Sequence, residues 1–145
     1  MSHTYASTLF HIVFSTKERQ SAIFDPAKLW AYVAGVARNL NYEALAIGGT
    51  ENHIHLLVRI PSHVAISEAV QKLKSNSSRW LRENGRWLGW QEGYGAFSVS
   101  VSKADAVRRY IQNQPEHHRR RSFEDEFVTL LNKSGIAFDR SEVFG

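Results

Sequence analysis

The chain has 145 residues, of which 43% are hydrophobic and 22% charged, a balance typical of globular proteins rather than disordered ones. The absence of cysteine excludes a disulfide, a thiolate metal site and a cysteine nucleophile. The net charge of +4 favours a polyanionic partner. The length suits one domain over residues 1–145. Because the sequence contains neither a signal-peptide pattern nor an apolar run long enough for a membrane helix, we expect a cytoplasmic protein without a membrane partner.

The first half of the chain predicts a strand, a helix and two further strands. β-branched and aromatic side chains favour a first strand at residues 8–14. Asp25 is a typical helix cap, and apolar residues then recur at helical spacing as far as Leu40. The next elements expected are a strand at 43–47, a turn at Gly48-Gly49 and a strand at 53–60.

The second half predicts three helices and one strand. In chain order they are a helix at 65–83, a loop at 84–95, a strand at 96–101, a helix at 103–114 that Pro115 stops, and a helix that Ser122 caps and that ends before Gly135. The resulting order, β-α-β-β-α-β and two further helices, is typical of an α+β, ferredoxin-like (RRM-like) fold. In this fold an antiparallel sheet has two helices on one face, and we expect its other face to be open.

Two histidines lie on one face of the strand at 53–60. The alternating residues Ile54 to Ile60 are aliphatic and are expected under the helices, so His53 and His55 point to the open face. The same alternation in the first strand turns His11 to that face. Imidazoles at positions i and i+2 can bind one cation, although an isolated pair is more often a feature of an exposed strand.

Tyr110 and Gln114 are four residues apart in the helix at 103–114 and therefore share one face. In isolation, Tyr110 would be interpreted as part of the apolar stripe of Val107 and Ile111. The combination of two imidazoles, an amide oxygen and a phenol favours instead a metal centre with a tyrosine nucleophile.

Four segments resemble the single-tyrosine HUH transposases of the insertion sequence 200/605 (IS200-like) family, where HUH denotes His-hydrophobic-His. They are HIVFSTK at 11–17, NHIHLLV at 52–58, YGAFSVS at 94–100 and YIQNQPEHH at 110–118. The segments follow the family's order, and the resemblance extends over nearly the whole chain. The resemblance implies that His53 and His55 bind a metal ion, that Gln114 is its third ligand and that Tyr110 is the catalytic nucleophile.

The resemblance also implies a bacterial or archaeal transposase that cuts and rejoins single-stranded DNA at element ends. The expected reaction is a transesterification in which Tyr110 joins the 5′ phosphate and frees a 3′-OH, assisted by one Mg²⁺ or Mn²⁺ ion per active site. The family recognises DNA hairpins and forms homodimers, so active sites shared between subunits are expected.

Basic and aromatic side chains outside these motifs are candidates for further contacts. His11, Lys17 and Arg109 are expected close to the metal or to a phosphate. Candidates for binding DNA are Lys72, Lys74, Arg79 and Arg82, together with Arg86, Arg108 and residues 117–121, and Trp87 or Trp90 is available to stack on bases. Any single basic residue of this kind is more often part of a solvated surface.

Other functions remain open at this point. A domesticated palindrome-processing enzyme or a replication-type HUH nickase would use the same chemistry. A non-catalytic RRM-like module is disfavoured because the expected open face carries histidines rather than aromatic residues. A simple metal hydrolase is disfavoured because no carboxylate is evident beside the histidines.

Overall fold

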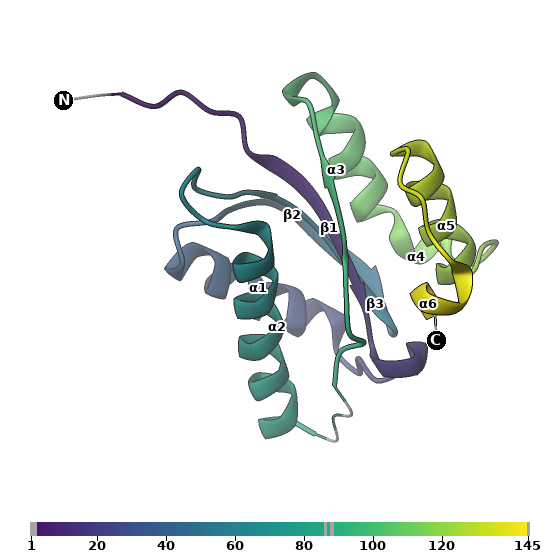
Figure 1. Cartoon of the computed structure of the whole chain (residues 1–145). Helices are drawn as coiled ribbons and strands as arrows, with labels where there is room; N and C mark the ends of the chain where they lie inside the picture. The colour runs from purple at the N-terminus through teal and green to yellow at the C-terminus, as the bar shows by residue number, and fades with distance from the viewer. Residues whose placement is uncertain (1–2, 86, 88, 145) are drawn as a thin grey trace.

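The computed structural model describes residues 3–85, 87 and 89–144, and its centre is a four-stranded antiparallel sheet between two layers of helices (Figure 1). The strands are β1 (Leu9–Ser15), β2 (Glu43–Thr50), β3 (His53–Arg59) and β4 (Gly95–Ser98), in the spatial order β2-β3-β1-β4. This order and the two helices between the strands confirm the predicted ferredoxin-like plan. The strand that carries the two histidines, β3, is central and pairs with both β1 and β2.

One face of the sheet packs against α1 (Pro26–Asn39) and α2 (Ile66–Glu83). The Asp25 side chain caps α1 by accepting a hydrogen bond from Lys28 N at 3.3 Å, as the sequence predicts. Alternate residues of the central strands form this core, among them Ile12, Phe14, Ile54, Leu56 and Val58. Each fully buried side chain of this size contributes about 1.5–3 kcal/mol to folding, so the alternation fixes which face β3 turns to α1 and α2.

The other face is not open, so that part of the prediction is wrong. It is covered by α3 (Ala104–Gln112), α4 (Gln114–His117), α5 (Phe123–Lys133) and α6 (Arg140–Phe144). His53 and His55 are 0% exposed and His11 is 4% exposed. The physical reason is that Leu9, Val13 and Leu57 share this face with the histidines, and the C-terminal helices bury them against Ile111 and Phe123.

Three predicted boundaries differ from the structure. The Gly48-Gly49 pair lies inside β2, which continues to Thr50 before the turn to β3. The last strand ends at Ser98, and Val101–Lys103 form a 3-10 turn instead of strand. The predicted helix at 103–114 is divided at Asn113, so that Gln114 begins α4, with Pro115 in its first turn.

The 3-10 turn at Lys17–Arg19, the short helix α4 and α6 were not predicted from the sequence. In the part of the chain that the structure describes, no helix is both long and apolar enough to cross a membrane.

Candidate active site

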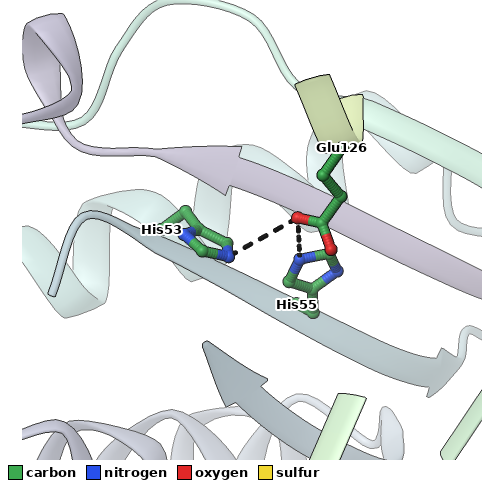
Figure 2. Close-up of side chains that lie close together, drawn as sticks. All are labelled: His53, His55 and Glu126. Carbon is green, nitrogen blue, oxygen red and sulfur yellow. Dashed lines mark hydrogen bonds and ion pairs between the residues drawn. The ribbon is translucent and has the colours of Figure 1, made fainter. Parts of the chain in front are cut away.

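The side chains of His53 and His55 meet Glu126 in the layer between the sheet and the C-terminal helices (Figure 2). The two histidines project from β3, and Glu126 reaches them from α5. Glu126 is only 1% exposed. Phe123, which precedes Glu126 by one helical turn, packs its ring 4.7 Å from the His53 ring and helps to close the site from the side of α5.

The Glu126 carboxylate is the common partner of the whole cluster. Its Oε1 atom lies 3.1 Å from His55 Nε2, 3.0 Å from His118 Nε2 and 3.6 Å from His53 Nε2. Its Oε2 atom accepts hydrogen bonds from the Tyr110 hydroxyl and, at 2.8 Å, from Gln114 Nε2. The structure therefore brings together Tyr110, Gln114, His53 and His55, the four residues that the sequence nominates for the site.

The far sides of the two imidazoles are held by other polar groups. His53 Nδ1 lies 2.8 Å from Asn52 Oδ1, and its Nε2 lies 2.8 Å from Gln114 Oε1. His55 Nδ1 lies 2.7 Å from Nε2 of His11, so His11 lies beside one of the two histidines that the sequence proposes as metal ligands. Contacts of this kind fix the ring orientation of a metal-binding histidine.

Burial controls the charge of the histidines. Desolvation, reinforced by the neighbouring His55, lowers the pKa of both His53 and His11 to about 3, so both are neutral near pH 7. A neutral imidazole is the form that binds a metal ion.

The acidic groups of the site are shifted in opposite directions. Burial by itself raises the pKa of Glu126, but hydrogen bonds from His118 and His55 outweigh this effect and hold the pKa well below its usual range. Burial, and then the hydrogen bond to Glu126, raises the pKa of Tyr110 above that of a free phenol. The resting site therefore contains a carboxylate and a protonated tyrosine.

The remaining nominated residues lie elsewhere. Lys17 and Arg109 are exposed and make no side-chain hydrogen bond or ion pair to the cluster among the described residues. The four basic residues of α2 that were predicted to bind DNA lie in the opposite helical layer. Lys74 donates hydrogen bonds to the carbonyl oxygens of Gln91 and Gly93. Lys72 forms an ion pair with Glu68, and Arg79 donates a hydrogen bond to Asn76. Arg86 lies outside the described residues.

Glu126 is not among the residues predicted from the sequence, and His117 and His118 are predicted only as candidates for binding DNA. His118 bonds Glu126 Oε1, and His117 Nε2 is 3.5 Å from Glu126 Oε2. The expectation that no carboxylate accompanies the histidines is therefore wrong. A signal was available, because Glu126 occupies the same face of α5 as Phe123, where an apolar residue would be expected.

Residues 4–114 match the sequence model of the family described as "Transposase IS200 like". The transposases of insertion sequence IS200 from Salmonella typhimurium strain LT2 and from Salmonella typhi are each 28% identical over 131 residues, which cover 82% of this chain and 84% of theirs. Tyr110 and Gln114 lie at the end of the matched region, and His117, His118 and Glu126 lie beyond it.

Two solved structures share the fold. A candidate transposase from Deinococcus radiodurans R1 is 22% identical with a TM-score of 0.63, covering 79% of this chain and 95% of its own. A REP-associated tyrosine transposase bound to a REP hairpin is 16% identical with a TM-score of 0.61, and the alignment covers 81% of this chain and 73% of that chain. Because the family match extends over well over half of the sequence, the chain belongs to the IS200-like transposase family.

Proposed function

We propose that the chain is a transposase that cuts and rejoins single-stranded DNA through a 5′-phosphotyrosine on Tyr110, with one Mg²⁺ or Mn²⁺ ion bound by His53, His55 and Gln114. The observation that carries the proposal is the convergence of the Tyr110 hydroxyl, both imidazoles and Gln114 on one buried carboxylate. We also propose that residues 1–145 form one transposase domain. The catalytic roles of these residues rest on the motif resemblance together with this geometry.

The donor atoms around His53 fit a cation. His53 Nδ1 faces Asn52 Oδ1 and His53 Nε2 faces Gln114 Oε1, and both oxygens can only accept hydrogen bonds. Both amides are fixed in this orientation, because Asn52 Nδ2 donates to Arg19 O and Gln114 Nε2 donates to Glu126 Oε2. A neutral imidazole has one N–H and satisfies only one of them, so a cation bound between Nε2 and the Gln114 oxygen resolves the mismatch.

When bound, a divalent cation polarises the scissile phosphate and stabilises the charge that develops on it. Tyr110 O attacks the phosphorus, the bond to the 3′ oxygen breaks, and the released 3′-OH takes a proton from solvent. The Tyr110 hydroxyl donates to Glu126 Oε2, so this carboxylate is an acceptor in contact with the phenolic proton that leaves as the bond to phosphorus forms. A second 3′-OH reverses the reaction and joins the strands, because the phosphotyrosine retains the bond energy.

The proposed substrate is single-stranded DNA with hairpins at the element ends. Support comes from the structurally similar REP-associated transposase, which was solved bound to a REP hairpin. The expected homodimer with shared active sites stays a prediction, and in the single chain the Tyr110 ring is 5.8 Å from the ring of His55 of the same chain.

Two of the other functions lose support. An RRM-like module binds nucleic acid on an exposed sheet face, whereas α3 to α5 cover that face here. Because Glu126 lies beside the histidines, the lack of a carboxylate is no longer an argument against a metal hydrolase. Membership of the transposase family argues against that function instead. A nickase that does not transpose would share the cleavage step and differ in the joining step.

The proposal is tested by trapping the covalent intermediate. Purified protein is mixed with Mn²⁺ and 3′-labelled single-stranded oligonucleotides that carry the hairpin-forming sequences flanking the gene. We expect a labelled protein band on a denaturing gel that requires the metal, because Tyr110 retains the 3′ portion of the cut strand. Tyr110→Phe should remove this band completely, since phenylalanine has no nucleophilic oxygen.

Tyr32→Phe is the matched control. The Tyr32 ring stacks on Trp80 in the opposite helical layer, 5.3 Å between centroids, so the same substitution there should leave the labelled band unchanged. Retention of the band in Tyr110→Phe, or no band from wild type on either flank, would contradict the proposed reaction. Transfer of the bound strand to a second 3′-OH distinguishes a transposase from an enzyme that only nicks.

A further inference from the structure

The two oxygens of Glu126 face different parts of the site. Oε1 is directed at the Nε2 atoms of His53 and His55, at 3.6 and 3.1 Å. Oε2 accepts hydrogen bonds from Tyr110 and Gln114. One side chain thus connects both imidazoles with the Tyr110 hydroxyl.

The spacing of these atoms is that of ligands around one ion. One ring nitrogen of His53, one ring nitrogen of His55 and one carboxylate oxygen of Glu126 all lie within 4.8 Å of one another. Two donor atoms bound to the same small divalent cation at about 2.0–2.2 Å from it cannot be further apart than roughly 4.4 Å, and neighbouring donors are about 3 Å apart. The separations of 3.1 and 3.6 Å from Glu126 Oε1 to the two Nε2 atoms meet this condition.

The chemistry of the donor atoms also favours Glu126 as a ligand of the cation. His53, His55 and Gln114 provide only neutral donors, whereas Mg²⁺ and Mn²⁺ prefer anionic oxygen. The site is fully buried, and a cation without a compensating negative charge is costly in such surroundings. Every ion-pair partner of Glu126 within the described residues is a histidine, so no lysine or arginine already neutralises this carboxylate there.

We propose that Glu126, from the C-terminal segment beyond the region that the family model matches, is a ligand of the catalytic cation through Oε1 and positions Tyr110 through Oε2. This inference rests on the proposed function and deepens it. Glu126 joins His53, His55 and Gln114 as the anionic member of the set. The helix α5 is accordingly part of the active site and not only a cover for the sheet.

The test is Mn²⁺ binding to the full chain without DNA, measured by isothermal titration calorimetry and by electron paramagnetic resonance of the free ion. Glu126→Gln preserves the shape and hydrogen-bonding capacity of the side chain but removes its charge. We expect its Mn²⁺ affinity to fall by at least about tenfold, the lower range for groups that tune a metal site. Glu126→Asp, which retains the charge, should recover part of this loss.

Glu124→Gln is the matched control, because it is the same substitution on the same helix. The Glu124 carboxylate forms a partly exposed ion pair 3.8 Å from Arg19 Nε, away from the histidines. We expect wild-type Mn²⁺ affinity. An affinity of Glu126→Gln within about threefold of wild type, with circular dichroism showing a folded protein, would overturn the inference.

A measurement on the unaltered protein covers the case in which both Glu126 variants fail to fold. The infrared difference spectrum between the Mn²⁺-bound and metal-free wild type should contain a shifted carboxylate band, and its absence would count against ligation by Glu126. Because binding is measured without DNA, the outcome is independent of the phosphotyrosine assay. Loss of the adduct in Tyr110→Phe with normal Mn²⁺ binding in Glu126→Gln would refute this inference alone.

Discussion

His11 shows how burial turns an ordinary histidine into part of the candidate active site. Its Nε2 lies 2.7 Å from His55 Nδ1, and the two rings stack with 5.0 Å between centroids. Desolvation and the neighbouring His55 lower the His11 pKa to about 3, whereas an unfolded chain has a histidine pKa near 6.5. The imidazole is therefore neutral in the folded protein over a range in which the unfolded chain binds a proton.

This difference predicts acid destabilisation of the metal-free protein. Between the unfolded pKa of 6.5 and the folded pKa of about 3, the unfolded state binds more protons, so stability is lost as the pH falls through this window. For one histidine the loss between about pH 7 and pH 5 is roughly 2 kcal/mol. The His11→Gln amide can keep a hydrogen bond to His55 but does not titrate. The stability that this variant loses over the same pH range should therefore be smaller than the wild-type loss by roughly 2 kcal/mol.

The measurement is urea unfolding with a chelator at several pH values. His118 has a raised pKa because its hydrogen bond to Glu126 outweighs burial, and it therefore acts in the opposite sense, but it is common to both proteins and cancels in the comparison. Parallel stability curves for wild type and His11→Gln would show that His11 does not stay neutral in the folded state.

At the element scale, the contact between β2 and α3 sets the position of the tyrosine. Gly48 of β2 pairs with His55 of β3, and the carbonyl oxygen of Ile111 lies directly over Gly48. A Cβ atom at this position would overlap that oxygen. Ile111 immediately follows Tyr110, so the glycine allows α3 to approach the sheet closely enough for the tyrosine to reach Glu126.

Gly48→Ala should therefore separate α3 from the sheet. We expect a loss of about 1–3 kcal/mol of stability from overpacking, and a decrease of at least about tenfold in phosphotyrosine formation because Tyr110 moves with the helix. Urea unfolding and the labelled-oligonucleotide assay measure the two effects.

Gly35→Ala provides the control for this prediction. Gly35 lies inside α1, where nothing is within 4 Å of an added Cβ, so alanine should stabilise the protein by about 0.5–1 kcal/mol and leave adduct formation unchanged. Wild-type stability and wild-type adduct formation in Gly48→Ala would mean that the close approach does not position Tyr110.

At the scale of the whole molecule, patterns confined to one element were predicted and packing between distant segments was not. The alternation in β1 and β3 and the caps at Asp25 and Ser122 are local, and each corresponds to an observed feature. The cover over the histidines and the arrival of Glu126 depend on how residues 115–144 fold back onto the sheet. No periodicity in that segment specifies the strand against which it packs, so the sequence can mark Glu126 as an unusual carboxylate on an apolar helix face but cannot place it beside the histidines.

The two helical layers also separate two kinds of surface. The candidate active site lies between the sheet and α3 to α5, whereas a groove of about 530 Å³ lies on the opposite layer, between α2 and the loop from Trp90 to Tyr94. Lys74 and Arg82 both line this groove. Lys74 already donates to two carbonyl groups of the loop, so Arg82, which is exposed in the last turn of α2, is the better candidate for a phosphate contact.

This separation predicts that DNA binding and metal binding can be changed independently. Arg82→Gln should weaken the binding of a fluorescent DNA hairpin and lower the slope of log affinity against log salt by about one, as expected for the loss of one phosphate contact. Its Mn²⁺ affinity should equal that of wild type, because the sheet lies between the groove and the histidines. Arg38→Gln, a matched substitution of an exposed arginine in the last turn of α1, should change neither quantity. Fluorescence anisotropy at several salt concentrations decides the matter: equal slopes for Arg82→Gln and Arg38→Gln would place the hairpin on another surface.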